Sequence, residues 1–131
     1  MASPEQYDAA VNAAHEAWKD WRMVSMPNRG YVVHKIGQEL TRLLDPLSKL
    51  ESLEVGKTYK EAVGEIIEYI HICEFATSNS RGAHGSKIPS EREFHQLEEI
   101  WNPLGVTAVI TAFNFPIAVY GTYDHGFEST F

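Results

Sequence analysis

The chain has 131 residues, 44% of them hydrophobic and 22% charged, with a net charge of −7 at pH 7. This size and composition fit one globular domain, whereas an acidic chain with scattered basic residues lacks the footprint of a nucleic-acid binder. No apolar run is long enough to cross a bilayer. One cysteine and an N-terminus without a targeting pattern predict a cytoplasmic protein without disulfides.

Capping signals predict a first helix close to the N-terminus. Ser3 and Gln6 form a capping box around Pro4, which suits the first helical position, and the helix should end near Met23. Spacings of three and four residues mark one apolar face. We expect that face to pack into the core; it carries Val11, Ala14, Trp18 and Trp21.

Two further helices follow. The second opens at Met26–Asn28 and is interrupted at Asp45–Pro46, because the residue before proline avoids helical geometry. Its apolar stripe comprises Val33, Ile36, Leu40, Leu43 and Leu44. Asp45 is predicted to cap a short third helix, which Gly56 ends. The third helix carries Leu47, Leu50 and Leu53.

A second capping box, Thr58 with Glu61, opens the longest predicted helix. Its apolar face comprises Val63, Ile66, Ile67, Ile70 and Cys73. We interpret Glu61 and Glu65 as a solvated acidic face. Cys73 lies among apolar residues, where a thiol is inert, so we assign it a structural role.

The second half of the chain predicts a loop and β-structure. Residues 78–86 have a loop composition, and 93–101 form a weakly predicted strand. Val106–Phe113 is apolar, β-branched and uncharged, which is typical of a buried strand. Asn114 follows it, at the position where open α/β sheets bind ligands. Asn114 is also suited to cap a following helix, and the residues alone favour that interpretation.

The segment Ile110–Pro116, with the sequence Ile-Thr-Ala-Phe-Asn-Phe-Pro, resembles the signature around the catalytic asparagine of NAD(P)-dependent aldehyde dehydrogenases. Further segments, in order, resemble the antiquitin-type branch of that family: Arg29–Gly30, Leu53–Lys57, Gly64–Tyr69, Ile72–Cys73, Pro89–Arg92 and Trp101–Pro103. The resemblance covers about Tyr7 to Gly121.

The resemblance implies an α/β fold. Residues 1–121 would form an incomplete NAD-binding, Rossmann-like domain, mostly helical, with a weak β-ribbon and one buried strand. Residues 122–131 depart from the family pattern and are expected to form a divergent tail. In the family, the region around 93–101 makes subunit contacts. Homo-oligomers are therefore expected of the family, and self-association or dependence on a partner is expected of this chain.

The resemblance also implies NAD-dependent oxidation of aldehydes, such as α-aminoadipic semialdehyde of lysine catabolism, to carboxylic acids. Asn114 matches the amide that stabilises the alkoxide. Residues Ile110, Thr111, Ala112 and Phe113 would lie beside the nicotinamide of NAD. Glu68 matches a glutamate that meets the substrate amino group, and Phe115 an aromatic wall. No metal site is expected, because the six histidines form no metal-type pair.

The family's phosphate-facing glycine segment, general-base glutamate and nucleophilic cysteine have no counterpart in this sequence. We therefore expect the chain to be inactive by itself. Two alternatives stay open: a non-catalytic interaction module, and an inactive product of an altered transcript. The exact aldehyde and the choice between NAD and NADP are open too, and family members can be mitochondrial.

Overall fold

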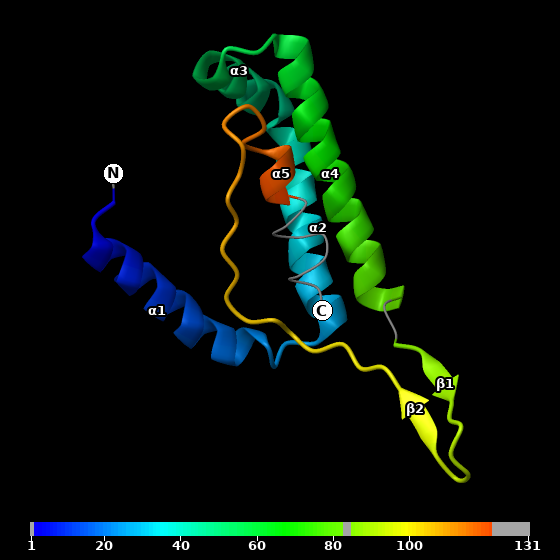
Figure 1. Cartoon of the computed structure of the whole chain (residues 1–131). Helices are drawn as coiled ribbons and strands as arrows, with labels where there is room; N and C mark the ends of the chain where they lie inside the picture. The colour runs from blue at the N-terminus through cyan, green and yellow to red at the C-terminus, as the bar shows by residue number, and fades with distance from the viewer. Residues whose placement is uncertain (1, 83–84, 122–131) are drawn as a thin grey trace.

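The structure is a computed structural model that describes residues 2–82 and 85–121. Four helices come first in the chain: α1 (Pro4–Trp21), α2 (Met26–Arg42), α3 (Leu44–Val55) and α4 (Tyr59–Gly82). A ribbon of β1 (Lys87–Pro89) and β2 (Gln96–Glu98) follows, and then α5 (Ala118–Gly121). Figure 1 shows α2 and α4 side by side, α3 at one end of them, and α1 and the ribbon extending away. The predicted tail, residues 122–131, lies outside the described residues.

The core lies between α2 and α4. Val33 of α2 packs there with Tyr69, Cys73 and Ala76 of α4. Two glycines let the helices approach closely: a Cβ on Gly30 would lie 2.1 Å from Ser80 Oγ, and one on Gly37 would lie 3.1 Å from Cys73 Cβ. Cys73 is 1% exposed, which confirms the predicted burial of its thiol.

Helix ends follow the capping signals closely. Both halves of the Ser3–Gln6 capping box are formed at α1. Thr58 and Glu61 cap each other reciprocally at α4, and Gly56 ends α3 with φ of 79°.

Two predicted helix boundaries were wrong. Asp45 lies within the first turn of α3 and pairs with Lys49, while Leu43 is the N-cap residue. The helix α4 continues to Gly82 through much of the predicted loop.

The first helix does not join the core as predicted. None of its residues is buried, and Trp21 is 39% exposed. Trp18 is half-buried, with the guanidinium of Arg22 over its ring at 4.9 Å. This face of α1 lines a cavity of about 600 Å³ together with Gly105 and Val106. The amphipathic pattern is present, but among the described residues only an extended segment lies opposite it.

The predicted ribbon is confirmed, and the predicted buried strand is wrong. The strands β1 and β2 pair antiparallel, with Ile88 opposite Leu97. Residues 106–113 form no strand: Ile110 is 92% and Phe113 88% exposed. A strand requires a neighbour to pair with its backbone, and this segment has none within the described residues. It runs extended from the ribbon back to the junction of α3 and α4 (Figure 1).

No helix in residues 2–82 or 85–121 combines the length and apolar character that crossing a bilayer requires.

Candidate functional site

Two of the residues that the sequence singled out, Glu68 and Asn114, line one cavity of about 400 Å³. Glu68 comes from α4, and Asn114 from the segment that returns from the ribbon. Phe115 lines the same cavity. The full lining is Lys57, Glu61, Gly64, Glu65, Glu68, Asn114 and Phe115. Glu68 and Asn114, which are 46 positions apart in sequence, therefore line the same cavity. Three carboxylate side chains are part of its lining.

Asn114 lies on a tight turn. The Phe115 backbone N–H donates to the Ala112 carbonyl over 3.1 Å. The Asn114 side chain is exposed and has no hydrogen-bond partner within the described residues, so its NH₂ group is free to donate into the cavity. It does not cap α5, which was the alternative role.

The N-terminal end of α5 is bound by Glu65. Its Oε1 accepts the backbone N–H of Ile117 over 2.8 Å and that of Ala118 over 3.0 Å. The Glu65 side chain is only 2% exposed. The prediction that Glu65 belongs to a solvated acidic face was therefore wrong, while Glu61 is exposed as predicted.

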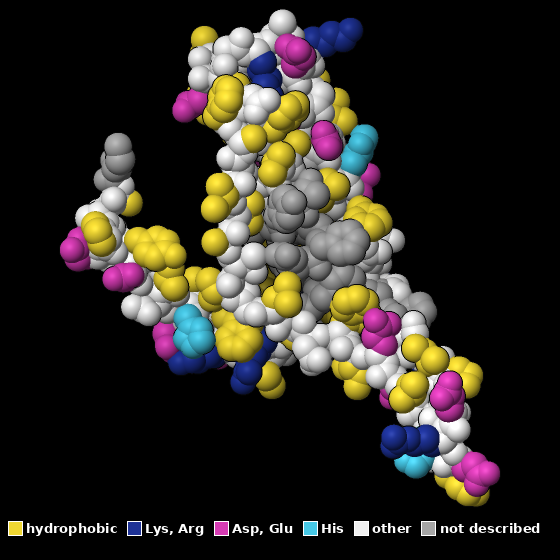
Figure 2. Space-filling model, in the orientation of Figure 1, with side chains coloured by type: hydrophobic (Ala, Val, Ile, Leu, Met, Phe, Trp, Pro, Cys, Tyr) yellow, Lys and Arg dark blue, Asp and Glu magenta, His cyan; other side chains and the backbone are white. Residues whose placement is uncertain are grey.

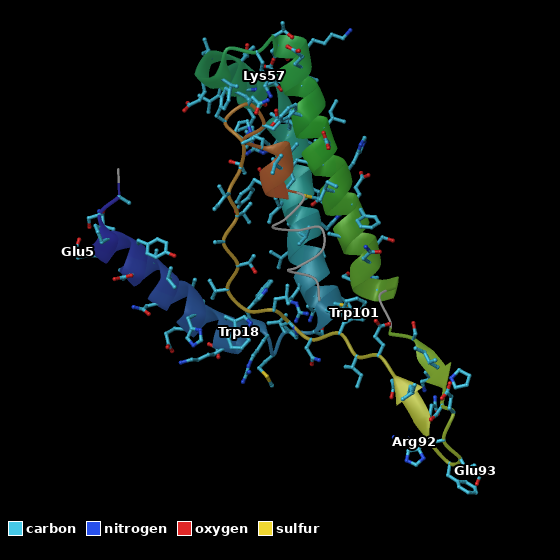
Figure 3. All side chains as sticks on the ribbon, in the orientation of Figure 1. Glu5, Trp18, Lys57, Arg92, Glu93 and Trp101 are labelled. Carbon is cyan, nitrogen blue, oxygen red and sulfur yellow. The ribbon has the colours of Figure 1, made fainter. Side chains whose placement is uncertain are left out.

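Lys57 lies at the junction of α3 and α4 (Figure 3). It connects two buried carboxylates. Its ammonium forms ion pairs with Glu65 Oε2 and, over 2.8 Å, with Glu51 Oε1. The Glu51 side chain is fully buried, yet neither of its oxygens has a well-aligned hydrogen bond in the described structure. We call Glu51, Lys57 and Glu65 the buried ion cluster.

The two carboxyl groups of this cluster have opposite pKa shifts. Burial raises the pKa of Glu51, and the neighbouring Glu65 raises it further. Burial also acts to raise the pKa of Glu65, but interactions with the neighbouring Glu51 and Lys57 and with two backbone N–H groups outweigh it and lower that pKa. Burial likewise disfavours the charged form of Lys57, but the two ion pairs overcome this and raise its pKa. Of these two carboxyl groups, Glu65 is therefore the one that stays ionised to the lower pH.

Phe115 contacts the buried ion cluster through its ring. The Lys57 ammonium lies 4.7 Å from the ring centroid, within the range of a cation–π interaction. The ring is half exposed and lines the cavity, so it can contact a ligand on its other side.

The predicted cofactor segment, Ile110–Phe113, is extended, and its side chains at Ile110 and Phe113 are exposed. The contact of this segment with a nicotinamide therefore stays a prediction. The phosphates of a dinucleotide need a glycine-bearing turn between a strand and a helix, which the described residues do not contain.

Two other chemistries find no support in the described residues. The Cys73 side chain is buried in the core between α2 and α4 and does not line the cavity. In the part of the chain that the structure describes, no three His, Cys, Asp or Glu side chains are arranged to hold a metal ion.

Sequence reasoning missed all three members of the buried ion cluster. One local signal could have indicated Glu65: it lies on the same helical stripe as Ala62, Ile66 and Tyr69, which are buried. A charge within a buried stripe requires a partner. Glu51 and Lys57 carried no comparable local signal.

Most of the chain matches known proteins in sequence. The family model described as "Aldehyde dehydrogenase family" matches residues 1–122. The chain is 51% identical over 120 residues to aldehyde dehydrogenase family 7 member B4 of Arabidopsis thaliana, covering 92% of this chain and 24% of that protein. It is 48% identical over 121 residues to α-aminoadipic semialdehyde dehydrogenase of Bos taurus, covering 92% of this chain and 22% of that protein.

The fold agrees as well. The crystal structure of an E. coli NADP-dependent enzyme superposes with a TM-score of 0.85 at 30% identity, covering 92% of this chain and 25% of that one. The chain thus spans about a quarter of the length of these relatives. The chain belongs to the aldehyde dehydrogenase family.

Proposed function

We propose that this chain supplies the oxyanion-binding amide and one wall of the substrate site of an NAD-dependent aldehyde dehydrogenase. Residues 1–121 would form part of its NAD-binding domain. The observation that carries the proposal is the shared cavity, where a free amide at Asn114 faces the same space as Glu68. The 48% identity to an α-aminoadipic semialdehyde dehydrogenase supports the substrate class.

The proposed role of Asn114 follows from its amide chemistry. When a nucleophile attacks an aldehyde, negative charge develops on the carbonyl oxygen. A fixed N–H donor that faces this oxygen stabilises the transition state more than the ground state, by about 3–4 kcal/mol in comparable acyl-transfer sites. The exposed Asn114 NH₂ has no competing partner in the described structure, which suits this task.

The cavity also favours a cationic substrate group. Glu61, Glu65 and Glu68 line it, against the single ammonium of Lys57, which already pairs with Glu65. Glu68 is exposed and forms no ion pair in the described structure. Its carboxylate can therefore accept a charge-assisted hydrogen bond from the amino group of an aminoadipate-type aldehyde.

We assign the cofactor NAD to the face that Ile110–Phe113 borders. When bound, NAD supplies the hydride acceptor for aldehyde oxidation. The residues of this chain would contribute apolar contact to the nicotinamide ring and hold the Asn114 amide beside it. The sequence has a single cysteine, a count typical of proteins of a reducing compartment, which supports a cytoplasmic location.

The test is a hybrid enzyme, in which residues 1–121 replace the equivalent segment of a full-length antiquitin-type aldehyde dehydrogenase. We expect it to form NADH from α-aminoadipic semialdehyde. Substitution Asn114→Ala should lower kcat by about 100-fold to 1000-fold while KM changes little, because the lost donor acts mainly in the transition state. Asn28→Ala, on the exposed surface of α2, is the matched control. An unchanged kcat in Asn114→Ala would overturn the assignment.

A second role, as an interaction module, is favoured for the isolated chain by its exposed apolar segment. Leu104 is 68%, Ile110 92% and Phe113 88% exposed.

The only thiol in the sequence is the buried Cys73, so covalent aldehyde chemistry by the isolated chain is not expected. NADH formation by purified chain above that of a Cys73→Ala variant would contradict this.

A further inference from the structure

The segment that follows Asn114 is held by the buried ion cluster through two separate contacts. The Lys57 ammonium lies over the Phe115 ring at 4.7 Å. Glu65 Oε1 accepts the N–H groups of Ile117 and Ala118, over 2.8 Å and 3.0 Å. Both contacts connect residues more than 50 positions apart in sequence, and they lie one to four residues after Asn114.

We propose that Glu51, Lys57 and Glu65 are positioning residues that set the place of the Asn114 amide in the cavity. The proposal deepens the proposed function and rests on it, since it concerns how the same amide is held. Glu51 comes from α3, Lys57 from the junction of α3 and α4, and Glu65 from α4, so α3 and α4, rather than the turn alone, determine where the amide lies.

The connectivity leaves the turn little freedom. The turn itself closes with one hydrogen bond, from Phe115 N–H to the Ala112 carbonyl. The residues before it are extended and exposed, so they add few constraints. The contacts after Asn114 are therefore the ones that anchor it. Because a misplacement of about 1 Å can cost on the order of 100-fold in rate, this anchoring matters for a donor that must face an oxygen.

Burial makes these contacts sensitive to the loss of any one charged partner. The side chains of Glu51 and Glu65 are 0% and 2% exposed, and Lys57 is 13% exposed, so water cannot easily replace a lost partner. Burying three charges costs desolvation energy, and apolar residues of similar volume would often stabilise a fold as well or better. An ionised Glu65 offers what an apolar residue cannot, namely an acceptor for two backbone N–H groups beside the candidate site.

A double-mutant cycle in the hybrid enzyme tests the proposal. Substitution Glu65→Gln keeps the size of the side chain but removes its charge. It should lower kcat by roughly 10-fold with KM within about twofold, because the amide is displaced and substrate contacts persist. In an Asn114→Ala background the same substitution should lower kcat by less than about twofold, because the group being positioned is already gone. Glu74→Gln, an exposed glutamate of the same helix, is the matched control.

The outcomes separate the two levels of the proposal. If Asn114→Ala lowers kcat but Glu65→Gln lowers it equally in both backgrounds, the proposed function stands and the positioning role is overturned. If Asn114→Ala leaves kcat unchanged, the proposed function fails.

Amide hydrogen exchange in the full 131-residue chain tests the anchor without catalysis. Glu65→Gln should speed exchange at Ile117 and Ala118 by roughly 10-fold, since a charge-assisted bond is replaced by a weaker one. Exchange in the middle of α2 should change by less than about twofold, which shows that the fold is intact. Unchanged exchange at both amides would refute the anchor.

Discussion

Gly30 of α2 lies directly against Ser80 of α4, so closely that a methyl group on Gly30 would come within 2.1 Å of Ser80 Oγ and 2.4 Å of Ser80 Cβ. The Thr77 hydroxyl reaches the Gly30 carbonyl at the same crossing, over 3.3 Å. The close approach of α2 and α4 at this crossing therefore depends on the absence of a side chain at Gly30.

We expect Gly30→Ala to lower the free energy of unfolding by about 1–3 kcal/mol, because the helices must separate to admit the methyl group. Gly64→Ala is the matched control: Gly64 is also helical, but a Cβ there meets nothing within 4 Å. Alanine should stabilise that position by about 0.5–1 kcal/mol through its higher helix propensity. Thermal unfolding followed by circular dichroism measures both. Equal effects of the two substitutions would refute the close crossing.

Glu68 and its substrate provide a specificity prediction. In the hybrid enzyme, Glu68→Gln should raise KM for α-aminoadipic semialdehyde by about 10-fold, because a charge-assisted hydrogen bond to the ammonium is lost. Oxidation of a simple aliphatic aldehyde, which carries no ammonium, should be nearly unchanged. Steady-state kinetics with the two substrates decides the matter, since equal losses on both would leave Glu68 as ordinary helix surface.

The buried ion cluster predicts opposite pH dependences for its two carboxyl groups. The pKa of Glu65 is lowered in the folded chain, so its ionised form stabilises the fold above its ordinary pKa of 4.5. That stabilisation disappears as the pH falls through the lowered value. Glu65→Gln should therefore destabilise the chain at neutral pH, and by progressively less in acid.

Glu51 has the opposite sign. Its pKa is raised in the folded chain, so folding favours the protonated form, and ionisation costs stability as the pH rises above 4.5. Glu51→Gln should therefore stabilise the chain relative to the native sequence at neutral pH, with the difference vanishing below pH 4.5. Melting temperatures of both variants between pH 3.5 and 7.5 test the pair. Parallel pH trends in the two variants would contradict this assignment.

How much the sequence could predict depended on how local each signal was. The capping boxes at Ser3 and Thr58 use residues three apart, and both are formed as expected. The assignment of Asn114 and Glu68 to one candidate site came from the family resemblance, and both side chains line one cavity. Glu65 was misjudged because its burial depends on Lys57, eight residues earlier, and on Ile117, 52 residues later. Hydrophobic pattern alone cannot show such partners.

The segment Val106–Phe113, which was predicted to be a buried strand, shows the same limit of local signals. Its composition is that of a buried strand, but composition specifies a buried environment without supplying the neighbours that create it. In the described structure the segment lies open, and Figure 2 shows hydrophobic side chains at the surface along the extended chain between β2 and α5.

That exposure predicts self-association of the isolated chain. An extended segment with apolar, β-branched side chains and unpaired backbone N–H and C=O groups is a template for intermolecular pairing. A net charge of −7 does not satisfy those backbone groups.

Replacing Ile110 and Phe113 by lysine should reduce association, because both side chains are almost fully exposed and the charges oppose edge pairing. Leu53→Lys, at an 84% exposed position of α3, adds charge without touching the segment. We expect sedimentation velocity at tens of micromolar, on the order of concentrations where exposed edges aggregate, to show oligomers for the native chain and for Leu53→Lys, and monomers for the double variant. A monomeric native chain would show that the open segment is not a contact surface.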